Sequence, residues 1–231
     1  MKPILFNTEM VRAILDGRKT VTRRVAFSEK DLRPFQSKDY PDGWWFRGRV
    51  YRSWDDATRT PQGVMSLCRY RREGVLYVRE TWLPLDGDHI IDGRKYAYRA
   101  DSTEDSEQLR TRYGYKWHPS IHMPKEAARI FLRVQDVHVE RVQEMSDIDA
   151  AKEGIQSYWS TPHDNDPPFI GRAKGIGNDL CFTRREAFGQ IWDSTVKPSD
   201  RALYGWDANP WVWVIDFERI SRDEALKEES K

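Results

Sequence analysis

The sequence predicts an α+β fold, a small mixed β-barrel with flanking short helices. Strand patterns are short and numerous, and the three clear helix patterns do not alternate with them as in a doubly wound parallel sheet. Ten Trp, ten Tyr and nine Phe supply the large apolar groups that a packed core needs. At 231 residues, the chain is long enough for one domain with insertions or for two small domains. We predict a single domain over residues 1–231, with large inserted loops at about 26–63 and 156–178.

The N-terminal segment is predicted to form a strand, a helix and a basic turn. Residues 4–6 are apolar and indicate a short buried strand. Thr8 is a suitable cap for a helix over 9–15, where apolar residues recur on one face, and Gly17 suits the position after its end. The β-branched residues 20–22 then begin a strand. The basic residues of this segment therefore lie on a helix-to-strand turn.

The remaining elements follow from period-2 and period-3.6 patterns and from turn residues. Strands are predicted over 74–82, 95–100, 128–142 and 211–217, and short helices over 146–153, 184–193 and the charged tail from Ser221. Within 128–142 the apolar residues change parity near Gln135, as a bulge or a bend would produce. Residues 101–112 are acidic and serine-rich, so we expect them to be exposed.

Charge is unevenly distributed along the chain. Residues 1–72 contain 16 Lys and Arg against 8 Asp and Glu, whereas the rest contains 22 against 29. A basic first third suits a polyanion or a phosphate-bearing ligand, although acidic parts of the second half can also fold back and neutralise it. In the 26–63 insertion, arginines lie beside tryptophans, a mixture that can stack on bases or can pin the insertion to the core.

Several kinds of site are not indicated. Cys68 and Cys181 form no C-x-x-C pair, so neither a disulfide framework nor a zinc knuckle is expected. His118 and His122 are four residues apart, but Pro119 prevents the helix that would align them on a metal. Dinucleotide, P-loop and nucleophile-elbow motifs are absent. We expect no metal, no cofactor and, without an apolar run of membrane length, a cytoplasmic protein.

The basic turn over residues 16–24 contains the strongest candidates for chemistry. A lysine among other cations has a lowered pKa and can act as a base, and a threonine hydroxyl needs such a base to act as a nucleophile. Lys19 and Thr22 fit these roles if the backbone turns between them, because residues three apart in a regular strand point to opposite faces. Glu153 is the expected third member, since a carboxylate at a helix C-terminus is poorly placed for stability alone. Glu80 is the competing carboxylate, and the alternative is a surface turn with an isolated helix-end Glu.

Three motifs occur in order along the chain: Gly17-Arg18-Lys19-Thr20-x-Thr22-Arg23-Arg24, the strand segment 74–82, and Asp149-Ala150-x-x-Glu153-Gly154. In these motifs the sequence resembles the ASCH domain family, a branch of the PUA-like superfamily. Residues 119–124 and 209–214 further resemble a longer subgroup found in phages and prophages. The matching segments cover most of the chain outside the two insertions.

The resemblance implies a PUA-like β-barrel with a cleft that faces a nucleoside or a nucleic acid. Small bacterial members of the family are amidohydrolases that remove the acetyl group from acetylated cytidine with a lysine, a threonine and a glutamate. These three carry over onto Lys19, Thr22 and Glu153. Other members bind RNA or are ribonucleases, so a binding module and a ribonuclease remain alternatives.

The resemblance and the charge pattern together suggest which residues contact the substrate. The expected partner is a modified nucleoside or a nucleic acid, with RNA favoured over DNA, and no membrane is expected. Backbone N–H groups after Gly17 are candidate donors to an oxyanion. Residues expected to contact substrate or phosphate are Arg18, Thr20, Arg23, Arg24 and Glu80.

Overall fold

The computed structural model describes residues 1–27, 32–59, 63–85, 95–156 and 183–229. The chain divides into two compact units. The first contains Met1–Lys19, Glu73–Val134 and Phe217–Lys231, and the second contains Thr20–Arg72 and Gln135–Asp216. The insertion predicted at 156–178 lies, apart from its first residue, outside the described residues.

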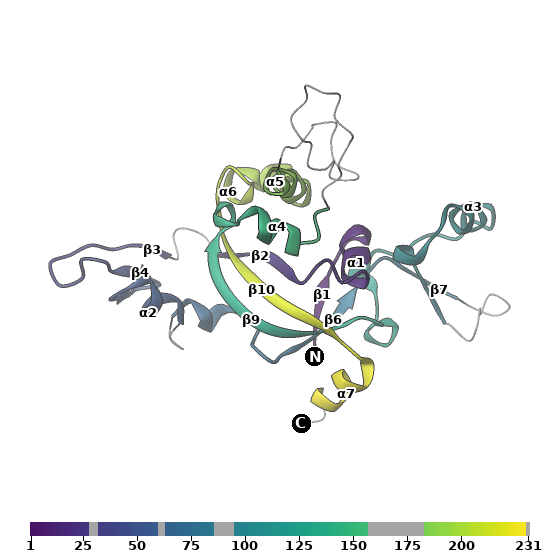
Figure 1. The fold of residues 1–231 in the computed structure, drawn as a ribbon, viewed down its shortest axis with the longest axis horizontal. Coiled ribbons are helices and arrows are strands. Elements are labelled where there is room, and N and C mark those ends of the chain that lie inside the picture. Colours follow the sequence, from purple (N-terminus) through teal and green to yellow (C-terminus); the bar gives the residue numbers. More distant parts are fainter. Residues whose placement is uncertain (28–31, 60–62, 86–94, 157–182, 230–231) are drawn as a thin grey trace, which may run out of the picture. The chain divides into compact units, whose positions relative to one another are not determined.

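A mixed sheet of five strands, in the order β1-β6-β9-β10-β2, supplies the frame. In the first unit, β1 (Lys2–Leu5) pairs in parallel with β6 (Val75–Arg79), which pairs antiparallel with β9 (Phe131–Arg141). In the second unit, β10 (Trp211–Ile220) pairs antiparallel with β2 (Val21–Phe27). The neighbouring strands β9 and β10 each contribute residues to both units (Figure 1).

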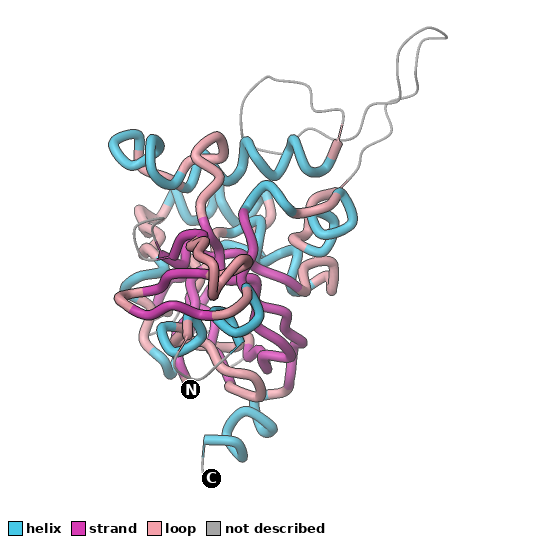
Figure 2. The backbone as a smooth tube through the Cα atoms, turned by 90° about the vertical axis from the view of Figure 1, so that its left-hand side faces the viewer, coloured by secondary structure: helices cyan, strands magenta, loops and turns pink. Residues whose placement is uncertain are grey.

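The predicted α+β class is confirmed, since helices and strands are both present throughout the described chain (Figure 2). The helices are α1 (Thr8–Leu15), α2 (Trp54–Arg59), α3 (Glu104–Arg112), α4 (Asp147–Lys152), α5 (Arg184–Thr195), α6 (Arg201–Tyr204) and α7 (Arg222–Glu229). The smaller strands are β3 (Leu32–Pro34), β4 (Trp44–Phe46), β5 (Arg49–Tyr51), β7 (Trp82–Pro84) and β8 (Tyr96–Tyr98). The described strands form no closed barrel. Of the described helices, none has the length and apolar character needed to cross a membrane.

Helix α1 begins one residue earlier than predicted, because Asn7 rather than Thr8 caps it. The Asn7 side chain accepts a hydrogen bond from the backbone N–H of Met10 at 2.8 Å. Asn is at least as good a helix cap as Thr, so the sequence alone allows either residue to cap the helix. The hydrogen bond to Met10 identifies Asn7 as the cap. Gly17 follows the helix as predicted, with a φ of +74° that glycine adopts without strain.

The first unit has its own apolar core beneath β6 and β7. Its buried members come from these strands, from the segment before β9, and from β9, β10 and α7: Val75, Tyr77, Trp82, Met123, Ala127, Ala128, Phe131, Ile220 and Ala225. This core holds the end of β6 in place, and Glu80 follows that strand directly.

Helix α3 lies in the segment that was predicted only to be exposed. It has no strong apolar face, and polar contacts fix it instead. Arg110 pairs with Glu107 at 2.8 Å within the helix, and Trp117 Nε1 donates to Glu107 at 2.9 Å. Apolar periodicity does not detect a helix held in this way.

Strand β9 explains the predicted change of parity. Phe131, Leu132 and Val134 are buried near the start of the strand, and Val139 is buried further along, so the alternation set by Leu132 and Val134 does not continue to Val139. The change falls where β9 leaves the first unit and enters the second. The change of parity therefore coincides with the passage of the strand from one unit to the other.

The second unit packs α4 and α5 together over part of the sheet. Helix α4 begins with the predicted capping box, in which Ser146 and Asp149 each accept a hydrogen bond from the other's backbone N–H. Thr183 and Glu186 do the same at the start of α5. The core beneath contains Val21, Val142, Met145, Ala150, Phe188, Trp192, Val212 and Val214.

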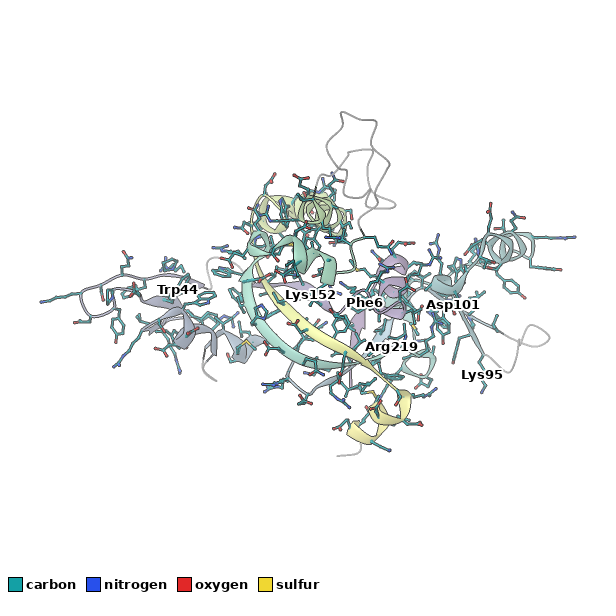
Figure 3. The ribbon with its side chains drawn as sticks, viewed as in Figure 1. Phe6, Trp44, Lys95, Asp101, Lys152 and Arg219 are labelled. Carbon is teal, nitrogen blue, oxygen red and sulfur yellow. The ribbon has the colours of Figure 1, made fainter. Side chains whose placement is uncertain are left out.

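The 26–63 insertion contains regular structure rather than a bare loop. Strands β3, β4 and β5 form a small antiparallel sheet, followed by α2. Trp44, labelled in Figure 3, packs edge-on against Trp54, and Trp54 stacks on Trp211 of β10 with ring centroids 4.7 Å apart. These tryptophans therefore attach the insertion to the main sheet. This is the structural role that the sequence offered for them as an alternative to stacking on bases.

Tyr98 gives the first unit a measurable dependence on pH. Its hydroxyl donates to the carbonyl of Ala127 at 2.7 Å, and burial raises the pKa of Tyr98 to about 12. Because the folded pKa lies above the ordinary value near 10, this contribution to stability is complete below pH 10 and is lost as the pH rises towards 12. We expect the free energy of unfolding, measured in urea at pH 9 and 11.5, to fall more for wild type than for Tyr98→Phe. Equal losses in the two proteins would contradict this assignment.

Candidate functional site

Five polar or charged residues are buried in the described part of the chain, and the sequence predicted every one of them as a site residue. They are Lys19, Thr22, Arg23, Glu80 and Glu153. Burial of a charge is costly unless the group is paired and hydrogen-bonded. The contacts of each side chain therefore show how the fold compensates for the cost of burying it.

Lys19 ends the first of the three segments that make up the first unit and is only 2% exposed. Its ammonium lies over the ring of Phe6, with Nζ 5.7 Å from the ring centroid. Arg18, by contrast, is only partly buried and pairs with Asp16 at 2.7 Å. The turn after α1 thus separates two adjacent cations, with the lysine inside and the arginine at the surface.

The backbone N–H groups of this turn already have partners inside the protein. Those of Arg18 and Lys19 donate to the carbonyl of Ala13 at 2.9 and 3.0 Å, and that of Thr20 donates to the carbonyl of Lys152 at 2.9 Å. The expectation that they hold an oxyanion is therefore wrong for these three groups. Instead, the Thr20 bond ties the start of β2 to the last residue of α4, which Figure 3 labels as Lys152.

Thr22 lies on β2 in the second unit and is fully buried. Its hydroxyl oxygen accepts a hydrogen bond from Arg24 Nη1 at 2.7 Å, and the same nitrogen donates to the carbonyl of Arg23 at 2.8 Å. Burial lowers the pKa of Arg24, while the charges of Tyr70 and Glu153 act in the opposite direction. A guanidinium in this position favours negative charge on the threonine oxygen.

Glu153 is held at the C-terminus of α4 by an ion pair with Arg23. Arg23 Nη1 donates to Glu153 Oε1 at 3.2 Å, and Arg23 also binds Glu140 Oε1 through Nε at 2.8 Å and Nη2 at 2.7 Å. Gly154, with a φ of +94°, ends the helix just beyond the carboxylate. Arg23, which the sequence assigned to phosphate contact, is thus buried between two carboxylates.

Glu80 follows β6 in the first unit and is paired with Arg129. Arg129 Nε and Nη2 donate to the two carboxylate oxygens of Glu80 at 2.9 and 3.0 Å, and Nη2 also donates to Asp101 at 3.0 Å. Burial raises the pKa of Glu80, and the hydrogen bonds and charge of Arg129 oppose that shift. The competing carboxylate is therefore part of a fixed ion-pair network.

The predicted residues fall into two groups. Thr22, Arg23, Arg24 and Glu153 are joined in the second unit by the contacts above, whereas Lys19 and Glu80 belong to the first unit. The convergence of Lys19 on Thr22 and Glu153 remains a prediction.

Sequence reasoning did not find Glu140 or Arg129, which hold two of the buried site residues. Glu140 has a local signal, because Asp136, His138 and Glu140 occupy alternate positions of one long strand pattern and so share a face. Arg129 has no such signal, since it reaches Glu80 across 49 positions of sequence.

Comparisons of the chain with family models, with curated proteins and with solved structures find no match.

Proposed function

We propose that the chain is an ASCH-type amidohydrolase that removes an acyl group from the exocyclic amine of a modified cytidine. The main support is the burial of Lys19, Thr22 and Glu153, the three residues that carry over from the amidohydrolases of the family. Polar groups removed from water without a structural need lower stability. A reaction that requires them gives a reason for retaining all three.

In the proposed reaction, Thr22 Oγ1 attacks the amide carbonyl and the neutral amine of Lys19 accepts the hydroxyl proton. Arg24, which already donates to Thr22 Oγ1 at 2.7 Å, stabilises negative charge at that oxygen as the bond forms. Collapse of the tetrahedral intermediate breaks the C–N bond, and the departing cytidine amine takes a proton from the lysine. Glu153 orients the amine, and water then hydrolyses the acyl-threonine ester to release the carboxylic acid and restore the hydroxyl.

The direct test is release of cytidine from acetylated cytidine, followed by chromatography. We expect turnover by wild type, strong loss in Lys19→Ala, Thr22→Ala and Glu153→Ala, and near wild-type turnover by Arg110→Ala, since Arg110 pairs with Glu107 within α3. Circular dichroism of each variant checks that it folds. No turnover by wild type, or turnover that survives all three substitutions, would contradict the proposal.

A second candidate function is non-catalytic binding of single-stranded nucleic acid, and the small sheet β3-β4-β5 favours it. The guanidinium of the exposed Arg33 lies 4.7 Å from the ring centroid of the partly buried Trp45. Paired cations and rings of this kind bind phosphates and stack on bases. This function predicts binding of labelled RNA that weakens steeply with salt and in Arg33→Ala, with the RNA left intact; cleavage of the RNA would indicate a ribonuclease instead.

A further inference from the structure

Three potential metal ligands gather on the sheet of the second unit, and none of them belongs to the predicted catalytic or substrate-binding residues. Asp136 and His138 occupy alternate positions of β9, and Asp216 lies on the neighbouring strand β10. One carboxylate oxygen from each aspartate and one ring nitrogen of the histidine all lie within 4.8 Å of one another. The two strands run side by side (Figure 1), so the sheet backbone fixes the spacing of the three residues.

The ring of His138 lies between two carboxylates of the same strand. Its Nδ1 lies 3.8 Å from Asp136, and its Nε2 lies 3.7 Å from a carboxylate oxygen of Glu140. A histidine that binds a metal through one ring nitrogen commonly donates the other N–H to a carboxylate, which sets the tautomer and the ring orientation. Glu140 is itself held by the buried Arg23, so its position does not depend on an ion.

Asp216 gives an independent reason to expect a cation. Its side chain is partly buried, yet it makes no hydrogen bond or ion pair with any residue that the structure describes. Asp136 adds a second negative charge beside it, and aspartate is disfavoured in strands. The charge of His138 acts on Asp216 more strongly than those of Lys152 and Arg23. A bound cation would neutralise both carboxylates at once.

We propose that Asp136, His138 and Asp216 bind a divalent cation of the Zn²⁺ class, with Glu140 as the positioning residue for His138. One imidazole with two carboxylates suits Zn²⁺, Co²⁺ or Ni²⁺, whereas Mg²⁺ and Ca²⁺ prefer oxygen ligands alone. Ligand atoms about 2 Å from a tetrahedral ion lie roughly 3 to 3.5 Å apart. The exposed side chains of Asp136 and His138 can close the remaining gap by small rotations. Three protein ligands leave a fourth position for water or for an anionic group.

The test is calorimetric titration of the full chain, freed of any affinity tag and treated with a chelator, with Zn²⁺ and separately with Mg²⁺. We expect saturable binding of one equivalent of Zn²⁺ by wild type, loss of that binding in His138→Ala and Asp216→Asn, and an affinity about 10–100-fold weaker in Glu140→Gln. The matched control is His122→Ala, an exposed histidine of the first unit, whose affinity should equal that of wild type. Visible absorption of the Co²⁺-loaded protein provides a second readout, because tetrahedral coordination gives bands that His138→Ala should remove.

Three outcomes would overturn this site. They are absence of saturable Zn²⁺ binding by wild type, unchanged affinity in both His138→Ala and Asp216→Asn, and tighter binding of Mg²⁺ than of Zn²⁺. If His138→Ala does not fold, Asp136→Asn gives the same comparison, since Asp136 is exposed. None of these measurements involves amide hydrolysis. They therefore test the cation site independently of the proposed reaction.

Discussion

Replacing Arg23 with methionine is expected to lower the free energy of unfolding by about 3–5 kcal/mol. The side chain of Arg23 is 2% exposed and that of Glu153 is 3% exposed, so removal of the guanidinium leaves a buried carboxylate without its cation. Methionine preserves most of the volume, so the loss reports charge rather than a cavity. Urea unfolding at pH 7, followed by circular dichroism, gives the measurement.

The matched control for Arg23 is Arg18→Met. Arg18 pairs with Asp16 at the surface, and exposed pairs of this kind contribute about 0–1 kcal/mol. The double variant Arg23→Met with Glu153→Gln should recover part of the lost stability, because it removes the uncompensated charge. A loss below about 1 kcal/mol in Arg23→Met would show that the ion pair does not hold Glu153 in the fold.

Replacing Thr22 with valine is expected to reduce the kcat for amide hydrolysis by at least about 10³-fold, if the proposed reaction is correct. Valine has nearly the shape of threonine but no hydroxyl, so the nucleophile and the acceptor for Arg24 disappear together. Thr22→Ser keeps a hydroxyl and should retain measurable turnover. The measurement is the initial rate of cytidine release at saturating substrate.

Thr20→Val provides the control for the nucleophile. Thr20 is exposed and contributes its backbone N–H, not its side chain, to the bond with Lys152. The kcat of Thr20→Val should therefore fall far less than that of Thr22→Val, because a contact with the substrate does not require the hydroxyl to act as a nucleophile. Equal rates for Thr22→Val and Thr20→Val would exclude the Thr22 hydroxyl as the attacking group.

Local signals in the sequence were sufficient to predict much of the fold. The capping box of α4 and the glycines after α1 and α4 have the predicted positions, because each depends on residues a few positions apart. The parity change in β9 was also visible, but the pattern does not reveal that the strand passes from one unit to the other at that point. Helix α3 was missed because polar side-chain contacts rather than an apolar face hold it.

The candidate site was predictable in its residue types but not in its pairing. Lys19, Thr22 and Glu153 could be selected because their chemistry is unusual for their local positions, and all three are buried. That Arg23 binds Glu140 and Glu153 depends on contacts between distant segments, whereas the bond from Arg24 to Thr22 joins residues two positions apart on β2. No local period encodes the contacts between distant segments. The sequence therefore led us to predict that Arg23 contacts phosphate. In the fold its side chain instead binds the carboxylates of Glu140 and Glu153.

The ion pair between Arg23 and Glu153 joins residues 130 positions apart in the chain. Contacts of this separation form only after a large loop has closed, so they contribute little to the folding transition state and much to the final state. Interactions that are absent from the transition state act mainly on the rate of unfolding. We therefore expect the loss of Arg23 to raise the unfolding rate of the second unit more than it lowers the folding rate.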